Sequence, residues 1–414
     1  MLSKRILKVL FVACVFASCQ SNSDPKKETM QHPVNYEKGS FGYDFNFLKS
    51  KDSQLVILKS NDSAAMVMVS PKYQGKVFTS TANGLYAKSF GWINYKAFDT
   101  TNAHMNGYGS EDRLWLGPEG GKYSLFFKPG VKMEFENWHT PAPIDNEAWT
   151  LVSSNNNKVS LKKETAIQNY AGTNLKITIE RDIELFGNKN IEQELGITID
   201  SSVKSVGFGT TNTLVNSGTI DWTQETGAPC TWNLGMFPPS TNTIIIIPYI
   251  DNTTGKIATT DYFGEIPKDR ITYKNGVLLF KADGKSRGKL GITPAHVKNI
   301  AGSYSADDNI LTIIKFDIDN KAAYLNQEWR TDKPPYSGDA MNAYNDGPLA
   351  DGSQMGPFYE LESVSPPAFL KQGEKMTHHH NVFHFTGNKN ALDSIAKKVL
   401  GVSLQDVSSA FASK

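Results

Sequence analysis

Short runs in which apolar and polar residues alternate occur along most of the chain and predict β-strands. In K-I-T-I-E-R-D-I-E-L, from Lys176, nearly every second residue is apolar, which is the spacing of a strand with one buried face. Clusters rich in Gly, Asn and Asp separate such runs and predict turns. The predicted strands are Leu55–Lys59, Ala65–Val69, Tyr123–Phe127, Lys158–Lys162, Leu175–Arg181, Ile191–Ile199, Thr243–Tyr249, Val277–Lys281 and Ile310–Ile318.

The order of these strands predicts an all-β protein, a large antiparallel β-sandwich, because no helical patterns lie between them. Only the C-terminus has helical spacing: apolar residues between positions 392 and 400 recur three and four residues apart, Gly401 is a suitable stop and Asn390 a suitable N-cap. Since no repeat or linker follows residue 40, we expect residues 40–414 to form one domain with a short C-terminal helix.

The N-terminal residues predict where in the cell the protein is located. Three basic residues within the first eight precede an apolar run too short to span a bilayer, and small residues lead directly to Cys19. This arrangement resembles a bacterial lipoprotein leader and implies a signal peptide at residues 1–18, a lipid on Cys19 and a flexible tether within residues 19–39; the alternative is an ordinary secretory signal. We therefore expect a cell-envelope protein, facing the periplasm or the cell surface, that contacts the membrane through its lipid alone.

The net charge limits the expected binding partners, and the cysteine content limits disulfide formation. Without the leader the formal net charge falls from +1 to −2. A net charge this close to zero argues against nucleic acid or anionic lipid as the main binding partner. Of the three cysteines, Cys14 leaves with the leader and Cys19 carries lipid, so Cys230 has no partner for a disulfide within the chain. Its neighbours, P-C-T-W-N, indicate a buried small side chain.

The segment from Leu361 to Phe385 carries the clearest chemical signal. Glu362 ends an apolar strand, a Pro-Pro break and a turn follow, and the next strand holds three consecutive histidines. In a strand, His378 and His380 share one face while His379 points away. A carboxylate beside imidazoles suits acid/base chemistry near neutral pH. Because neither an H-x-x-x-H nor a cysteine-based pattern is present, we predict hydrogen bonding for the histidines, and no metal or other cofactor.

A second group of candidate residues lies in G-S-E-D-R-L-W-L-G-P-E-G-G, from Gly109 to Gly121. Arg113, Trp115 and Glu119 alternate, so their side chains are expected on one sheet face. Charged groups suit sugar hydroxyls and an indole suits the apolar face of a pyranose ring. The alternative is a cross-strand ion pair beside a packed Trp. Gly117 favours a site because glycine permits close backbone approach.

A third group lies in N-A-Y-N-D-G-P, from Asn342. The segment reads as a loop in which Asn, Asp and Gly turn the chain. Tyr344 and Asn345 are candidate ligand contacts. The alternative is that turn formation alone explains the polar residues there.

The C-terminal motif L-E-S-V-S-P-P…F-L-K-Q-G-E-K…H-H-N-V-F-H-F resembles the C-terminal signature of the galactose mutarotase-like (aldose 1-epimerase) superfamily. The resemblance implies a sandwich that binds sugar on its concave sheet, with Glu362 as general base and Gly373-Glu374 as the turn into the next strand. The stretch G-S-E-D-R-L-W-L-G-P-E is similar to mutarotase-like lipoproteins of carbohydrate-degrading Gram-negative bacteria, over most of residues 40–400.

One position departs from that pattern. The superfamily places an acid histidine in a motif close to N-L-T-N-H, whereas this chain has T-L-V-N-S-G, so Asn216 fits and Ser217 stands where the histidine is expected. A serine hydroxyl is too weakly acidic to donate a proton near neutral pH. For an epimerase-like reaction, the proton would then come from His378 or His380.

Three functions follow from these residues. The first is a carbohydrate enzyme with Glu362 as base, His380 or His378 as acid, and Arg113 and its neighbours orienting the sugar. The second is a glycan-binding lipoprotein without chemistry. The third is a glycan hydrolase or lyase that pairs Glu360 with Glu362, whose Cα atoms are expected about 7 Å apart on one strand face. The first hypothesis predicts Glu362 in the largest concave pocket, with Arg113 and at least one of the two histidines.

Overall fold

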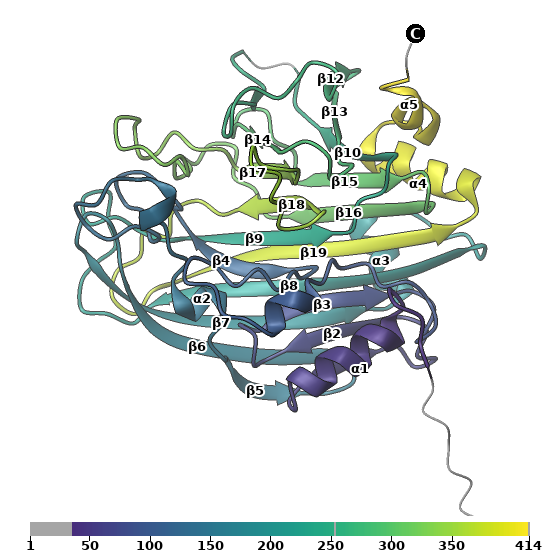
Figure 1. Ribbon diagram of the computed structural model, residues 1–414, viewed down its shortest axis with the longest axis horizontal. Coiled ribbons are helices and arrows are strands. Elements are labelled where there is room, and N and C mark those ends of the chain that lie inside the picture. Colours follow the sequence, from purple (N-terminus) through teal and green to yellow (C-terminus); the bar gives the residue numbers. More distant parts are fainter. Residues whose placement is uncertain (1–34, 252–253, 413–414) are drawn as a thin grey trace, which may run out of the picture. The chain divides into compact units, whose positions relative to one another are not determined.

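Two antiparallel sheets lie face to face and form a β-sandwich, which confirms the predicted fold class (Figure 1). The computed structural model describes residues 35–251 and 254–412, so the predicted signal peptide, Cys19 and most of the tether lie outside the described residues. The residues from Tyr36 onward form one unit. Among the described residues no helix has the length and apolar character needed to cross a bilayer.

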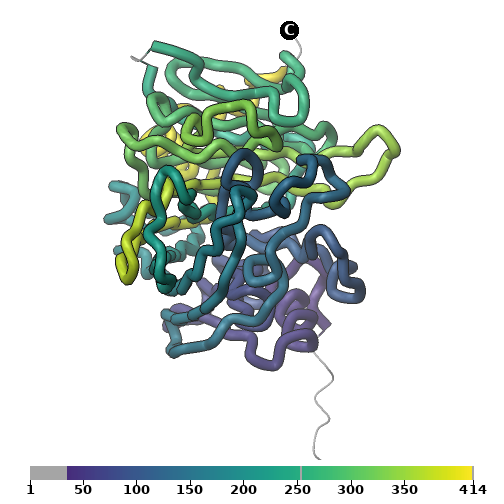
Figure 2. Tube along the Cα trace, turned by 90° about the vertical axis from the view of Figure 1, so that its left-hand side faces the viewer, coloured from purple at the N-terminus to yellow at the C-terminus, as the bar shows by residue number. Residues whose placement is uncertain are grey.

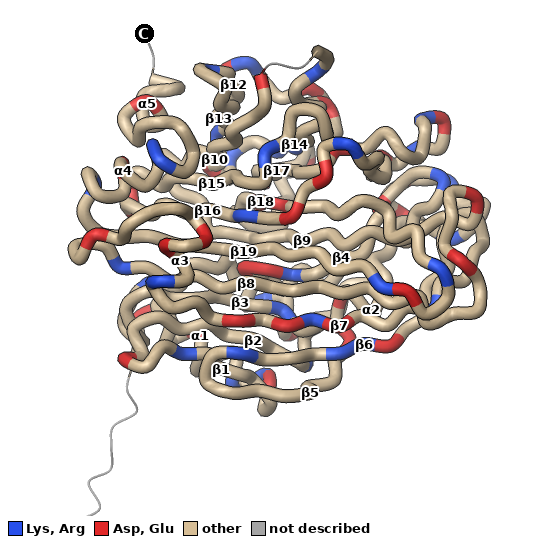
Figure 3. Tube along the Cα trace, turned by 180° about the vertical axis from the view of Figure 1, so that it is seen from behind, with Lys and Arg blue, Asp and Glu red and all other residues tan. Residues whose placement is uncertain are grey.

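The larger sheet has ten strands. In chain order they are β5 (Thr150–Ser154), β6 (Lys158–Gln168), β7 (Asn174–Phe186), β8 (Val203–Asn216), β10 (Thr243–Pro248), β12 (Ile271–Lys274), β13 (Val277–Lys281), β15 (Ile300–Ser305), β16 (Ile310–Phe316) and β19 (Lys375–Gly387). They lie side by side in the order β12-β13-β10-β15-β16-β19-β8-β7-β6-β5. Acidic and basic residues follow one another along β7 (Figure 3).

The smaller sheet has six strands. They are β4 (Arg113–Gly117), β9 (Cys230–Phe237), β11 (Ala258–Thr259), β14 (Gly288–Ile292), β17 (Met341–Asn345) and β18 (Tyr359–Val364). Their order in the sheet is β11-β14-β17-β18-β9-β4. Alternate residues of these strands, such as Leu290, Ala343 and Leu361, are fully buried and belong to the apolar core shared with the ten-stranded sheet. The residues between them therefore face away from that sheet.

The N-terminal region adds a third, small sheet. It consists of β1 (Val56–Lys59), β2 (Met66–Ser70) and β3 (Lys76–Thr81), and α1 (Phe41–Lys51) precedes it. A bridge between Val77 and Asp112 links β3 to the start of β4. Figure 2 shows this region at one end of the sandwich and the segment containing β10 to β14 at the other.

Three short helices cover part of the free face of the ten-stranded sheet. They are α3 (Asn188–Leu195), α4 (Lys389–Leu400) and α5 (Leu404–Ser409). Leu392 and Ile395 of α4 pack with Leu311 of β16 and Phe383 of β19 in a second apolar cluster. The predicted C-terminal helix is thus confirmed, although its N-cap is Asn388 and not Asn390, because the Asn388 side chain accepts the free N–H groups of the first turn.

Two predicted strands are wrong. Residues 191–199 contain α3, in which Ile191 and Leu195 lie one turn apart and are buried, and Gly196 ends the helix with a φ of 65°. Residues 123–127 form an irregular segment without strand pairing, although its apolar side chains are buried in the core. Both runs contain several apolar residues, and burial alone does not distinguish a strand from a helix or a packed loop.

A buried ion pair joins the two sheets. On β7, Arg181 occupies one of the inward positions that isoleucines fill on either side, and its guanidinium lies 3.3 Å from the Asp112 carboxylate at the start of β4. Neither side chain is exposed. Asn233 and Thr210 donate to the two Asp112 oxygens, at 2.9 and 3.0 Å, and Arg181 donates to Asn212 at 2.7 Å. Burial alone would raise the pKa of Asp112, but the Arg181 guanidinium holds that pKa below its usual range.

Replacing Arg181 with Met tests this pair. The variant leaves the Asp112 carboxylate buried without its partner, so we expect the free energy of unfolding in urea to fall by about 3–5 kcal/mol. The matched control is Asp182→Asn, one residue further along β7, because Asp182 pairs with Lys158 at 2.8 Å on the exposed face. That change is expected to cost less than about 1 kcal/mol. Equal losses in the two variants would contradict the role assigned to the buried pair.

Candidate functional site

Side chains from five neighbouring strands, most of them polar, meet on the outer face of the six-stranded sheet, the face turned away from the ten-stranded one. Lys289 lies opposite Tyr344, and Tyr344 lies opposite Glu360. Two residues further along β18, Glu362 lies opposite Asn342 of β17 and Leu234 of β9. Leu234 in turn lies opposite Arg113 of β4. Residues directly opposite one another in an antiparallel sheet project to the same side. This "Glu362 cluster" is defined by Arg113, Glu119, Trp232, Lys289, Glu360 and Glu362.

Glu362 lies at the centre of the cluster and is fully buried. Its Oε2 accepts a hydrogen bond from Trp232 Nε1 at 2.8 Å and forms an ion pair with Lys289 Nζ at 3.2 Å. The Lys289 ammonium also lies 4.7 Å from the centre of the Trp232 ring. Among the described residues, Oε1 has no hydrogen-bond partner. One oxygen thus fixes the carboxylate while the other remains available as an acceptor.

Glu360 lies two residues before Glu362 and forms an ion pair with Arg113, at 2.9 Å. The Arg113 guanidinium lies 4.2 Å from the Trp115 ring centre, so both members of the predicted Arg–Trp pair belong to this site. Burial raises the pKa of Glu360 to about 7; the Arg113 guanidinium opposes the shift and the Glu362 carboxylate reinforces it. Glu360 and Glu362 therefore share a face, as predicted, but differ in their partners.

Glu119 follows β4 on a loop that turns back over the sheet. Its backbone N–H donates to Gln327 Oε1 at 2.6 Å, and a Cβ on Gly120 would lie 2.1 Å from the Glu328 carbonyl oxygen. Glycine is therefore required where the loops at 118–121 and 326–330 pack together. Burial raises the pKa of Glu119, with the Lys289 ammonium opposing the shift and the Glu362 carboxylate adding to it.

Aromatic rings border the cluster. On one side, Trp138 stacks on Trp329 with ring centres 5.8 Å apart, and Trp115 lies 6.5 Å from Trp138. On the other side, Tyr344 meets Phe263 at 6.0 Å. Trp329 and Tyr344 are only partly buried, so each presents ring surface at the edge of the cluster. Flat apolar rings beside fixed charges suit a ligand that has both C–H faces and hydroxyl groups.

The structure does not bring His378 and His380 to Glu362, and the predicted pairing is wrong. Glu362 and Ser363 are consecutive in β18, so their side chains lie on opposite faces of the sheet. It is Ser363 Oγ that contacts the histidines, at 3.1 Å from His378 Nε2 and 2.8 Å from His380 Nδ1. Both imidazoles are therefore buried between the sheets. Burial lowers the pKa of His378 to about 3, and it also lowers the pKa of His380.

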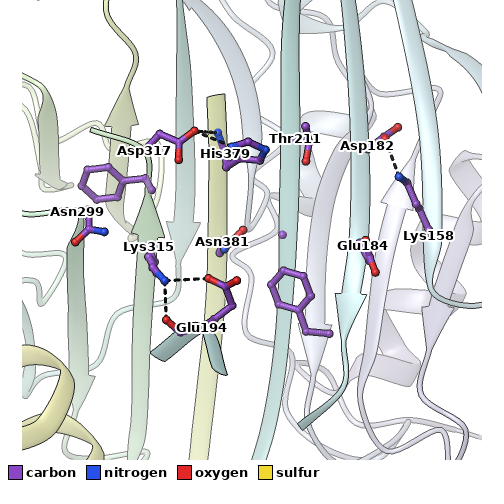
Figure 4. A pocket seen from close by; sticks show the side chains of 13 residues that line it. Lys158, Asp182, Glu184, Glu194, Thr211, Asn299, Lys315, Asp317, His379 and Asn381 are labelled. Atoms are coloured by element: carbon purple, nitrogen blue, oxygen red, sulfur yellow. Dashed lines mark hydrogen bonds and ion pairs between the residues drawn. The ribbon is translucent and has the colours of Figure 1, made fainter. Parts of the chain in front are cut away.

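His379 points to the free face of the ten-stranded sheet, as the strand spacing predicted. It lines a hollow of about 410 Å³ there, shown in Figure 4, and lies 2.7 Å from Asp317. The two lysines of this hollow, Lys158 and Lys315, pair with Asp182 and Glu194 at 2.8 and 3.0 Å. Glu362 does not line this hollow or the two surface hollows of about 720 and 750 Å³.

Two further predicted positions have structural explanations. Asn345 is buried on the inner face, where its side chain accepts from Gly284 N at 2.9 Å and donates to the Ser286 carbonyl at 2.8 Å. It fixes a turn and does not reach the outer face. Asn216 donates to two backbone carbonyls at the end of β8, while the Ser217 hydroxyl accepts from Thr178 at 3.3 Å.

The sequence interpretation missed Lys289 and Trp232. Lys289 is a lysine inside the otherwise apolar strand G-K-L-G-I, and Trp232 stands two residues after Cys230. A buried lysine in a strand is a signal of a carboxylate partner. Identifying that partner required the register of β14, β17 and β18, which no local pattern contains. Cys230 itself is buried, as predicted, and burial raises the pKa of its thiol to about 12.

Within residues 35–251 and 254–412, no group of three or more His, Cys, Asp or Glu side chains is arranged to hold a metal ion. The Glu362 cluster itself contains several groups that can exchange protons or bind charge. They are a buried carboxylate with one free oxygen, two carboxyl groups of raised pKa, and two cations.

Comparisons with solved structures give several similar proteins, some of which are described as mutarotase-like. A galactose mutarotase-like protein from Lactobacillus casei is 10% identical, with 80% of this chain and 99% of that chain covered and a TM-score of 0.46. A galactose mutarotase related enzyme from Lactobacillus acidophilus is 8% identical, with 81% and 97% covered and a TM-score of 0.44. The Slr1438 protein from Synechocystis sp. PCC 6803 is 12% identical, with 81% and 96% covered and a TM-score of 0.47.

Comparisons of sequence give one family. The model of a family of unknown function (DUF6786) matches residues 39–411, which includes every residue of the Glu362 cluster. No curated protein matches the chain.

The raised pKa of Glu360 makes stability depend on pH. Between about pH 4.5 and 7 the folded protein keeps the Glu360 proton while the unfolded chain releases it, so this contribution to the free energy of unfolding falls as pH rises. Between these two pH values the contribution of Glu360 to the free energy of unfolding is expected to fall by on the order of 3 kcal/mol. Urea unfolding of wild type and Glu360→Gln at several pH values measures it. The wild-type profile should decline relative to the variant, and parallel profiles would contradict the assignment.

Proposed function

The chain belongs to the family of unknown function DUF6786, and we propose that it binds a carbohydrate at the Glu362 cluster and acts on it by acid/base chemistry of the epimerase type. The observation that carries the proposal is the state of Glu362: a buried carboxylate, fixed through one oxygen by Trp232 and Lys289, with its other oxygen free to accept a proton. The resemblance of L-E-S-V-S-P-P to the mutarotase motif supports the same role for this glutamate.

The surroundings of Glu362 favour a sugar as the ligand. The Arg113 and Lys289 cations can donate to hydroxyl oxygens, and the Glu360 and Glu119 carboxyl groups exchange hydrogen bonds with hydroxyl groups. The rings of Trp329 and Tyr344 offer apolar surface for the C–H face of a pyranose. Carboxyls, cations and rings thus surround one acceptor oxygen.

The reaction follows from these positions. Glu362 takes the proton of the anomeric hydroxyl, the C–O bond of the ring breaks, and an acid gives a proton to the ring oxygen. Rotation about the bond to the aldehyde carbon and reversal of the two proton transfers then close the ring with the opposite anomeric configuration. The base and the acid end each cycle in their starting protonation states.

Glu119 is the residue proposed as the acid. His378 and His380 lie on the other side of β18, and Ser217 lies at the end of β8. Glu119 is partly exposed, interacts electrostatically with Glu362, and has a pKa that burial raises, which favours the protonated form that an acid requires. Two carboxyl groups whose environments differ in this way are the usual basis of an acid/base pair.

The location of the protein in the cell envelope is also part of the proposal. The sequence of the first nineteen residues supports a lipid on Cys19 and a position in the cell envelope, where glycans are available. The tether within residues 19–39 would leave the sandwich free to reach a glycan from the membrane surface.

Replacing Glu362 with Gln tests the base. The variant keeps the shape of the side chain and loses its proton acceptor, so mutarotation of aldoses followed by polarimetry should slow by roughly 10²–10⁴-fold. Glu180→Gln is the matched control, because Glu180 is an exposed glutamate on β7, and its rate should equal that of wild type. If wild type does not exceed the uncatalysed rate with any aldose while calorimetry still detects sugar binding, the protein is a glycan-binding module without chemistry.

Replacing Glu119 with Gln tests the acid. The amide cannot supply a proton to the ring oxygen, so kcat should fall by roughly 10²–10⁴-fold while KM changes little. The pH profile of kcat/KM should also lose its alkaline limb, because that limb reports the acid. A variant with unchanged kcat would assign the proton to another group.

A further inference from the structure

A groove leads away from the Arg113 end of the Glu362 cluster. Its first part is a hollow of about 220 Å³ lined in part by Met105, Gly107 and Met355. Its second part, of about 720 Å³, extends to Trp92 and Tyr95. Both hollows are lined by Asn94, Lys96 and Met355, so they lie next to each other, and together they are called the groove.

One wall of the groove contacts the proposed site. Met105, in the wall of the first hollow, places its sulfur 3.8 Å from Arg113 Nη1, and Arg113 is paired with Glu360. A side chain at position 107 would meet Met355, since a Cβ there would lie 3.0 Å from the methionine sulfur. Gly107 therefore allows Met355 to pack against the backbone beside Met105. The far wall is also connected to the site, because Trp92 contacts Phe358 at the start of β18, at 4.8 Å between ring centres.

The groove carries positive charge. Lys38, Lys88 and Lys96 line it and are exposed. Lys88 pairs with Asp308, at 2.5 Å, and the other two lysines have no ion-pair partner among the described residues. The acidic residue of the lining is Asp44, which is buried and accepts a hydrogen bond from the Tyr95 hydroxyl. Exposed cations therefore outnumber exposed anions along the groove.

Aromatic surface lies beside these cations. Trp92 and Tyr95 are partly exposed, and the Lys38 ammonium lies 5.1 Å from the Tyr95 ring centre. Rings of this kind bind the C–H faces of sugars, while ammonium groups bind carboxylates or sulfates. The hollow of Figure 4 differs, because its lysines are already paired with acidic side chains.

We propose that this groove binds the continuation of an anionic oligosaccharide, with carboxylate or sulfate groups on its sugars, whose terminal residue occupies the Glu362 cluster. The inference rests on the proposed function and extends it from a single sugar to a charged chain. Trp92 and Tyr95 bind successive sugar rings, and Lys38 and Lys96 bind the anionic groups. The full groove exceeds the volume that one monosaccharide requires.

Calorimetry with three oligosaccharides of equal length tests the groove: a galacturonate oligomer, a sulfated galactan oligomer and a neutral galactan oligomer. At least one charged oligomer should bind more tightly than the neutral one, and added salt should weaken that preference. The double variant Lys38→Gln/Lys96→Gln should weaken binding of the charged oligomer by roughly three- to tenfold, as expected for two exposed charge contacts. The charged oligomer that binds more tightly identifies the anionic group, carboxylate or sulfate, that the groove prefers.

The matched control is Lys158→Gln/Lys315→Gln, which removes two lysines from the ten-stranded sheet and should leave binding unchanged. Both pairs of lysines are at least partly exposed, so the variants are expected to fold. Equal binding of charged and neutral oligomers, or equal effects of the two double variants, would overturn the inference.

The design separates this inference from the proposed chemistry. Glu362→Gln should retain the preference for the charged oligomer while it loses mutarotation. Conversely, if mutarotation of free aldoses depends on Glu362 but the lysine variants bind every oligomer as wild type does, the groove proposal fails and the proposed function stands.

Discussion

The contact between Asp112 and Arg181 fixes the distance and the register between the two sheets. Both charges are withdrawn from water, so the pair is favourable only because Asn212, Asn233 and Thr210 satisfy the remaining hydrogen-bonding groups. These partners come from both sheets, and small displacements would leave a charge without compensation. Because Asp112 immediately precedes Arg113, the same backbone that is held inside also positions the first cation of the outer site.

The outer site also stabilises charged side chains by placing opposite charges beside them, but it contains more charged groups and is less completely withdrawn from solvent. Glu119, Glu360 and Glu362 would repel one another in a buried setting, and Lys289 and Arg113 offset that repulsion. Each cation contacts a different carboxylate, so the three glutamates are not equivalent. That difference allows groups of one chemical type to have different protonation states, which is what proton transfer in both directions requires.

The sequence predicted the fold class well because the strand signal is local. Alternation of apolar and polar residues is visible along β7, and the C-terminal helix shows equally regular spacing. It failed where the apolar residues also fit another structure: the run from Ile191 contains a helix, and the run from Tyr123 is an irregular buried segment. For the site, local signals identified Glu362, Arg113, Trp115, Glu119 and Glu360 as candidates. The choice of histidines failed because it depends on which face of β18 meets β19, and this is a property of the assembled sandwich.

The alternation of Glu362 and Ser363 has a consequence for how such a chain can change over time. Adjacent residues of β18 serve two different compartments, one facing the outer cluster and one hydrogen-bonded to imidazoles between the sheets. Insertion or deletion of a single residue in this strand would exchange the two sets of side chains and place a carboxylate in the apolar interior. Length variation among relatives should therefore be confined to the loops around β18, or occur in steps of two residues.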